Sequence, residues 1–235
     1  MPQAPGSAYL GGMAHASVSP EDLRRAVLVP LRRSRGDIEH GPHRFAPGAV
    51  RRRAAVLCAV VPRETGLQVV LTRRPDTMPT HPGQIAFPGG KVDRTDRSPL
   101  ATALREAHEE IGLHPGLADV IGPLDPYVTR SGFVITPFVA MVAPSFRPMP
   151  CAREVAAVFE APLDHLMDPA NHRRHSRVWQ GQVREFWAMP WQAWFIWGAT
   201  AGMLRGLAER LAHARDEPPP ALPAAVPLAD PALIA

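Results

Sequence analysis

Three glutamates close together in a predicted helix are the residues of this 235-residue sequence best suited to chemistry. Glu106, Glu109 and Glu110 fall in residues 98–111, and at about 100° per residue their side chains project within an arc of roughly 100°. Like charges at this spacing repel by about 0.2–0.5 kcal/mol per pair, and the helix dipole disfavours anions near the carboxyl end. Helix energetics therefore does not explain the cluster, whereas a bound divalent cation would.

The ligand type indicates which cation to expect. Carboxylate oxygens are hard ligands that select Mg²⁺ or Mn²⁺ over zinc, and such ions activate water and neutralise the charge of a diphosphate. Gly90, in a Pro-Gly-Gly turn, has no side chain and allows a backbone carbonyl to approach the same metal. Arg105 can pair with Glu109 four residues later. The alternative is a solvated, charge-patterned helix face, which is the commoner explanation of an isolated E-x-x-E-E pattern.

Local signals define the helix that contains these glutamates. Ser98 can cap its start, Pro99 fits the first helical position, and Gly112 suits the residue after the last turn. A short strand is predicted at residues 84–87, immediately before the glycine turn. A strand, a glycine turn and a capped helix around the motif favour a functional site over an exposed charged face.

The surrounding pattern predicts an α/β (α+β) fold in which a mixed β-sheet lies between helices. Apolar or alternating runs predict further strands at residues 54–61, 67–72, 119–124, 134–142, 154–160, 175–179 and 184–188. Further helices are predicted at residues 20–29 and 191–213.

Composition restricts the partners. Residues 1–53 contain nine Arg and four acidic residues, whereas residues 54–235 balance to a net charge of −1, so the excess positive charge lies outside the predicted core. We therefore expect no nucleic-acid partner, because binding would need basic residues on the folded body. Two cysteines, Cys58 and Cys151, and no apolar run of about 18 residues predict a cytoplasmic protein without a membrane partner.

The helix and its glycine turn also resemble a known motif. The run Gly90-x5-Asp96-x8-Arg105-Glu106-Ala107-x-Glu109-Glu110-x-Gly112-Leu113 is similar to the Nudix box of the Nudix hydrolases, with Asp for Glu and a spacer one residue longer. Three other segments resemble the coenzyme A pyrophosphatase branch: residues 71–90, 131–137 and 196–200. Within the first, Pro75 and Pro79 stand where that branch has Ser and Arg.

The resemblance implies roles for individual residues. It makes Glu106, Glu109 and Glu110 metal ligands, with Gly89 or Gly90 offering a carbonyl, and Arg105 the residue that orients them. Glu154 corresponds to a further glutamate that acts as ligand or general base, the alternative being an ordinary acid at a strand start. The resemblance also assigns five residues to substrate binding: Arg73, Arg74, His81, Gln84 and Phe133. For His81, a purely structural place in the loop is equally compatible with the sequence.

Composition and the resemblance together predict three segments: a basic, partly helical extension at residues 1–45, a Nudix hydrolase domain at 46–214, and an Ala/Pro-rich disordered tail at 215–235. All five tryptophans fall in residues 179–197, where we expect core or an oligomer interface, with nucleobase stacking as the alternative. A homodimer is compatible with this pattern.

The function that this resemblance implies is Mg²⁺- or Mn²⁺-dependent hydrolysis of a small nucleotide. Its substrate would be coenzyme A or acyl-CoA, cleaved to 3′,5′-ADP and (acyl-)4′-phosphopantetheine. Because of Pro75 and Pro79, another nucleoside diphosphate derivative such as ADP-ribose or NADH is the alternative substrate. A non-catalytic Nudix-fold ligand sensor is disfavoured, because the box glutamates are present.

Overall fold

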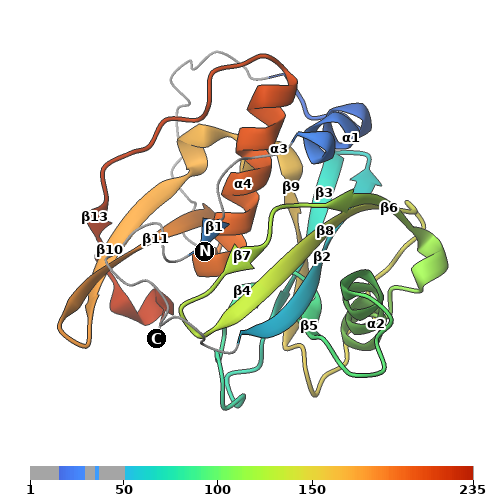
Figure 1. Ribbon diagram of the computed structural model, residues 1–235, viewed down its shortest axis with the longest axis horizontal. Coiled ribbons are helices and arrows are strands. Elements are labelled where there is room, and N and C mark those ends of the chain that lie inside the picture. Colours follow the sequence, from blue (N-terminus) through green and yellow to red (C-terminus); the bar gives the residue numbers. More distant parts are fainter. Residues whose placement is uncertain (1–15, 30–34, 37–50, 235) are drawn as a thin grey trace, which may run out of the picture.

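A long strand buried on both faces forms the middle of the structure. The computed structural model describes residues 16–29, 35–36 and 51–234 (Figure 1). Strand β2 (Arg52–Arg63) runs parallel to β8 (Phe133–Val142) and antiparallel to β3 (Gly66–Arg73). Burial on both faces explains why the sequence of β2 is continuously apolar and does not alternate.

Two sheets are built around this centre. The larger has the order β1-β7-β8-β2-β3-β4, and β5, β6 and β9 pair with β2, β8 and β3 respectively. Its other strands are β1 (Arg35–Gly36), β4 (Ile85–Ala86), β5 (Gly89–Lys91), β6 (Ala118–Pro123), β7 (Tyr127–Val128) and β9 (Ala157–Pro162). The smaller sheet consists of β12 (Trp194–Trp197), β11 (Gln182–Trp191), β10 (Arg173–Trp179) and β13 (Val226–Pro227), in that order.

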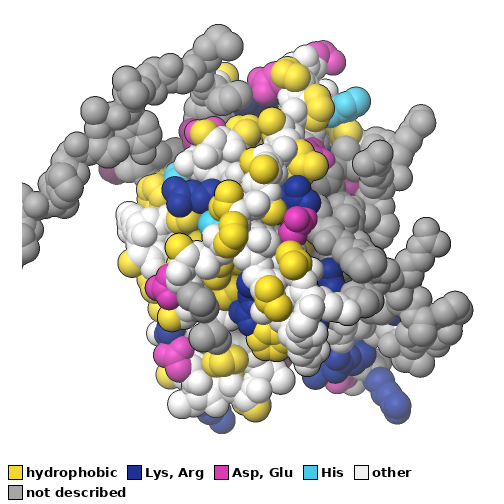
Figure 2. Space-filling view, turned by 90° about the vertical axis from the view of Figure 1, so that its left-hand side faces the viewer, with side chains coloured by type: hydrophobic (Ala, Val, Ile, Leu, Met, Phe, Trp, Pro, Cys, Tyr) yellow, Lys and Arg dark blue, Asp and Glu magenta, His cyan; other side chains and the backbone are white. Residues whose placement is uncertain are grey.

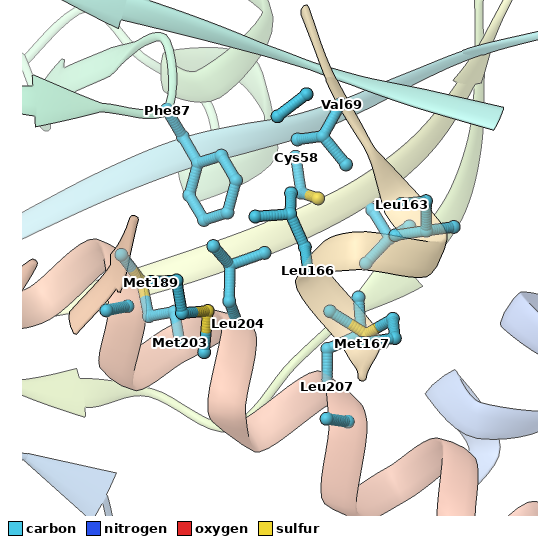
Figure 3. Close-up of a cluster of buried hydrophobic side chains, with 14 of the residues drawn as sticks. Cys58, Val69, Phe87, Leu163, Leu166, Met167, Met189, Met203, Leu204 and Leu207 are labelled. Atoms are coloured by element: carbon cyan, nitrogen blue, oxygen red, sulfur yellow. The ribbon is translucent and has the colours of Figure 1, made fainter. Parts of the chain in front are cut away.

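Helices cover both faces of the larger sheet (Figure 1). Helix α2 (Pro99–Ile111) packs on the face that includes Leu57, and α4 (Gly198–Ala214) packs on the face that includes Cys58. Figure 3 shows the hydrophobic cluster on the face that includes Cys58. There, side chains of α4 and of α3 (Leu163–Met167) contact those of β2 and β3. This arrangement confirms the predicted mixed sheet between helices.

The predicted helix at residues 191–213 is wrong in its first part. Residues Trp194–Trp197 form strand β12, which pairs antiparallel with β11, and α4 begins only at Gly198. Gln192, with φ 52°, lies in the turn between the two strands, and Gly198 has φ 64°. The aromatic and β-branched residues of β12 suit a strand, and pairing with β11 outweighs the helical spacing of the apolar residues.

The described residues include only part of the predicted amino-terminal extension. Helix α1 (Pro20–Leu28) has the predicted N-cap, because Ser19 Oγ accepts a hydrogen bond from the Asp22 backbone N–H. The rest of the predicted extension, residues 1–15, 30–34 and 37–45, lies outside the described residues. The domain boundaries at 45/46 and 214/215 stay predictions. None of the helices in the described ranges is long and apolar enough to cross a membrane.

The carboxyl-terminal segment differs from the expected disorder. Strand β13 runs parallel to β10, and a short 3₁₀ helix, η3 (Pro231–Ile234), follows it. Arg205 of α4, only 3% exposed, donates hydrogen bonds to the carbonyls of Pro220 and Ala221. A Pro/Ala-rich composition predicts disorder because it offers little apolar surface, but a buried arginine supplies partners for its backbone.

His172 belongs to the same buried contact. Its Nε2–H donates to the Leu166 carbonyl at 2.8 Å, and its Nδ1 accepts from Arg205 at 3.3 Å. The ring is 3% exposed, and burial lowers its pKa to about 4. The folded protein therefore holds this histidine neutral, with a tautomer fixed by two neighbours.

This lowered pKa predicts a pH dependence of stability. An unfolded chain takes up a proton at this histidine near pH 6.5 but the folded chain only near pH 4, so protonation favours unfolding between these values. Wild type should therefore lose about 2–3 kcal/mol relative to His172→Gln as the pH falls from about 6.5 to about 4. Urea unfolding at several pH values measures this difference. The exposed His213→Gln variant is the control, and parallel pH profiles for His172→Gln and wild type would contradict the prediction.

Candidate active site

The ends of α2 are built as its sequence predicts. Ser98 Oγ accepts a hydrogen bond from the Ala101 backbone N–H at 3.1 Å, and Pro99 occupies the first turn. Gly112 has the left-handed conformation, with φ 70°, and its N–H caps the last turn. These local signals fix which residues of the helix point toward β5.

The loop that contains Met149 and Cys151 is hydrogen-bonded to the last carbonyls of α2. The backbone N–H groups of Met149 and Cys151 donate to the carbonyls of Ile111 and Glu110, each at 2.9 Å. Helix ends leave such carbonyls without intrahelical partners. A turn in which the Glu154 N–H donates to the Cys151 carbonyl then places Glu154 beside the helix end. Glu154 lies three residues before β9 begins, and the strand predicted to start at Glu154 is shorter at that end.

The structure brings Glu106, Glu110 and Glu154 together. One carboxylate oxygen of each lies within 4.8 Å of the others. Gly90 makes this possible, since a Cβ there would lie 2.4 Å from Glu106 Oε1. The Gly89 N–H donates to Glu110 Oε2 at 3.1 Å. The glycine turn therefore contacts two of the three glutamates directly.

Burial makes this cluster unfavourable without a cation. Glu110 is 6% exposed, and burial raises its pKa to about 8, opposed by the Gly89 N–H. Burial also raises the pKa of Glu106, while Arg105 acts in the opposite direction. Three oxygens of hard ligand type at close range, two of them on partly or fully buried groups, fit a divalent cation. Glu106, Glu110 and Glu154 are the side chains able to hold it.

Arg105 connects the cluster to a residue whose role the sequence did not indicate. Its Nε and Nη2 donate to both oxygens of Asp96, each at 3.0 Å, and Asp96 also accepts from Thr102 Oγ1 at 2.8 Å. This two-pronged pair holds the pKa of Asp96 well below its usual range. The arginine is thereby oriented, and its Nη1 lies 3.0 Å from Glu106 Oε1.

Glu109 lies beside the cluster. Its carboxylate is half exposed and accepts from Arg105 Nη1 at 2.9 Å, which is the predicted pairing four residues apart. The helical arc therefore divides into an inner pair, Glu106 and Glu110, and an outer member, Glu109.

The residues expected to bind substrate fall into three regions. Arg73 and Gln84 line a cavity of about 420 Å³ at the end of β3, and Arg73 Nη2 lies 2.6 Å from Asp76 Oδ1. Arg74 lies near enough to Glu110 to act against the rise in its pKa. The pKa of His81 is lowered, first by partial burial of the ring and second by the charge of Arg74. Arg73 is the last residue of β3, and Arg74 follows it with its backbone N–H bonded to the Gln84 carbonyl.

Phe133 occupies a third place. It begins β8, and the Arg52 guanidinium stacks over its ring at 4.1 Å, with Lys91 Nζ at 6.0 Å. Lys91 follows Gly90 directly, so this ring lies near the glycine turn and not in the cavity beside Arg73.

The cavity also includes residues that the sequence pattern did not assign to substrate. Trp194, Phe195 and Trp197 of β12 form one side, and Trp194 stacks on Phe159 at 4.4 Å. The concentration of aromatic residues in residues 179–197 was the sequence feature that could have indicated this wall. The position of these side chains relative to Arg73, however, depends on the pairing of β11 with β12. Trp187, by contrast, is core, as expected.

Comparison with known proteins assigns the family. The structure combines a mixed sheet between helices with an acidic cluster at one helix end, and residues 51–180 match the NUDIX domain family model. The chain belongs to the Nudix hydrolases, which act on pyrophosphate bonds and generally use divalent metals.

Two sequence relatives and one solved structure illustrate the similarity. The chain is 44% identical over 159 residues to Uncharacterized Nudix hydrolase NudL of Enterobacter sp. (strain 638), covering 67% of this chain and 82% of the relative. It is 36% identical over 200 residues to Nudix hydrolase 15, mitochondrial, of Arabidopsis thaliana, covering 82% and 67%. The Nudix hydrolase RenU of M. smegmatis is 25% identical, with a TM-score of 0.42 and coverage of 50% and 74%.

The close approach of Gly90 to Glu106 predicts the effect of a single methyl group. Gly90→Ala should displace the Glu106 carboxylate and weaken Mn²⁺ binding about tenfold or more, because a Cβ would lie 2.4 Å from Oε1. Titration with Mn²⁺ followed by calorimetry measures this loss. Adding Glu106→Asp, which shortens the side chain, should cost less in the Gly90→Ala background than in wild type. Additive losses would show that the two residues do not compete for space.

Proposed function

We propose that the protein hydrolyses the diphosphate of coenzyme A or acyl-CoA, with Mg²⁺ or Mn²⁺, to 3′,5′-ADP and (acyl-)4′-phosphopantetheine. The observation that supports hydrolysis most directly is the three-carboxylate cluster of Glu106, Glu110 and Glu154. The coenzyme A part of the proposal is supported by the three segments that resemble that pyrophosphatase branch.

The side chains divide the work in this proposal. Glu106 and Glu110 bind the cation, with the Gly90 carbonyl as a further oxygen, and Glu109 binds on the solvent side. When bound, the cation supplies charge neutralisation for the diphosphate and activation of water. Arg105, fixed by Asp96, orients Glu106 and Glu109.

Glu154 is the proposed general base or additional ligand. It is exposed, whereas Glu110 is buried, so Glu154 is the cluster member with direct access to a water molecule. A base must lie within hydrogen-bond reach of the proton that it removes. Its attachment to the end of α2 through Cys151 keeps it at that position.

Positive side chains near the cluster can receive the phosphates. Arg74 is close enough to influence the pKa of Glu110, and its Nε makes no hydrogen bond within the described residues. Arg73, His81, Gln84 and Phe133 complete the set that we propose for substrate binding. Arg74 would stabilise negative charge on the phosphoryl oxygens, which is often the largest contribution of fixed groups to phosphoryl transfer.

We place the enzyme in the cytoplasm with a small nucleotide substrate as its partner. Cys58 and Cys151 are both free thiols, in agreement with a reducing compartment. A homodimer and the absence of a nucleic-acid partner stay predictions from the sequence.

A comparison of substrates tests the coenzyme A assignment. We expect kcat/KM for coenzyme A to exceed that for ADP-ribose and NADH about tenfold or more, with Mg²⁺ and with Mn²⁺. Pro75 and Pro79 provide the specific reason to include the other two compounds, since they stand at two positions of the branch signature. A preference for ADP-ribose or NADH would replace the coenzyme A assignment, and no turnover of any of them would favour the ligand sensor.

Neutralising single glutamates tests the site itself. Glu109→Gln and Glu110→Gln should each lower kcat about 100-fold or more, because both remove negative charge at the proposed cation site. Glu110→Gln should keep the metal-free protein folded, since burial already disfavours the charged carboxylate. Steady-state kinetics and thermal unfolding, each with and without Mn²⁺, measure these effects. The control is Glu64→Gln in the exposed β2–β3 turn, and near-normal turnover in either site variant would remove that residue from the proposal.

A further inference from the structure

The cavity beside Arg73 has three walls from distant parts of the sequence. Its volume is about 420 Å³, within the range of small-molecule pockets. The end of β3 and the following loop supply polar groups, including Arg73, Asp76 and Gln84. The aromatic side of β12 forms a second wall, and Ala232, Leu233 and Ile234 of η3 form the third.

The third wall is held in place by contacts along the whole carboxyl-terminal segment. Arg205 binds the carbonyls of residues 220 and 221, and the Leu228 N–H donates to the Ser176 carbonyl at 2.9 Å. At the end of the segment, Arg177 Nη1 donates to the Ile234 carbonyl at 3.3 Å. Figure 2 shows the side of the molecule that lies on the left in Figure 1, where hydrophobic side chains are scattered among polar and charged ones. The segment we call the strap is residues 217–234.

The cavity and the acidic cluster share one loop. Gln84 lines the cavity, and its carbonyl accepts from the Arg74 N–H at 3.0 Å. Arg74 acts on the pKa of Glu110, and Gly89, five residues after Gln84, donates to the same carboxylate. The loop that follows β3 therefore connects the cavity with the glutamates that would bind the diphosphate.

We propose that the strap completes a substrate pocket, which holds one organic end of the substrate, and that Leu233 and Ile234 determine which end fits. This inference rests on the proposed hydrolysis of a nucleoside diphosphate derivative. The chemistry required is a group that can hydrogen-bond and also pack against apolar side chains, which both an adenosine and a pantetheine arm provide. Arg73, Asp76 and Gln84 offer the polar contacts, and the aromatic and aliphatic walls offer the apolar ones.

This assignment locates specificity outside the family match. The matched residues end at 180, whereas two of the three walls come from residues 193–197 and 232–234. Catalytic residues and substrate-selecting residues are thus separated along the chain. Change in the strap can alter the substrate without disturbing the glutamates.

Filling the cavity from the strap side tests the proposal. Leu233→Trp should weaken binding of 3′,5′-ADP or of 4′-phosphopantetheine about tenfold or more, because Leu233, which is 47% exposed, lines the cavity and a larger ring there competes with the ligand for space. Calorimetry in EDTA, without divalent metal, measures binding separately from turnover. Leu222→Trp is the matched control, since Leu222 lies in the same strap, is 64% exposed and does not line the cavity.

The two products distinguish the two ends. Weaker binding of 4′-phosphopantetheine alone assigns the cavity to the pantetheine arm, and weaker binding of 3′,5′-ADP alone assigns it to the adenosine. Leu233→Ala should relax the selection by enlarging the cavity, and should raise KM with kcat within about twofold. Unchanged binding of both products in Leu233→Trp would overturn the role of the strap.

A failure of the strap proposal can be distinguished from a failure of the proposed coenzyme A hydrolysis. If wild type prefers ADP-ribose or NADH to coenzyme A, the same variants are compared by KM for that compound, and the strap is tested although the coenzyme A assignment has failed. Equal KM values for wild type, Leu233→Trp and Leu222→Trp would then reject the strap alone. A wild-type protein that neither binds nor hydrolyses any of these compounds would contradict both proposals.

Discussion

The crowding of carboxylates against a glycine turn is the constraint on which the site depends. Glu106 occupies the space that a side chain at residue 90 would need, and Glu110 is held by the backbone of Gly89. Arg105 relieves only part of the repulsion, because Asp96 already uses two of its donors. Burial raises the pKa of Glu110, and the neighbouring Glu106 raises it further, so the ionised cluster is unfavourable unless a positive charge lies beside it.

The parts of the site predicted from the sequence are those fixed by short-range chemistry. Ser98 and Gly112 define α2, and the spacing of Glu106 and Glu110 places them on one side of it. Glu154 could be assigned only by resemblance, because its place depends on a loop that caps a helix 40 residues earlier in the chain. The pairing of Asp96 with Arg105 could not be predicted from the sequence for a related reason. It joins a loop to a helix, and no periodic pattern records that contact.

The fold shows the same division between local and long-range information. The buried strand β2 was evident from its apolar run, and its parallel neighbour β8 also came from a clear pattern. Residues 191–197 gave a false helix because a short continuous apolar run such as Trp194–Trp197 suits either a strand or a buried helix segment, and only the pairing with β11 decides between the two. The strap was misjudged because its prolines and alanines provide few apolar contacts, and its order comes from Arg205 on another element.

Helix α4 connects these levels of structure. Leu204 and Leu207 bury one side of it against the main sheet, and Arg205 projects between His172, Trp187 and the strap. An arginine with three such neighbours is costly to move, since each of its donors would lose a partner inside the protein. The position of the strap is therefore tied to the core rather than to the surface. These contacts fix the backbone of the strap at residues 220 and 221, which distinguishes it from a tail that only lies on the surface.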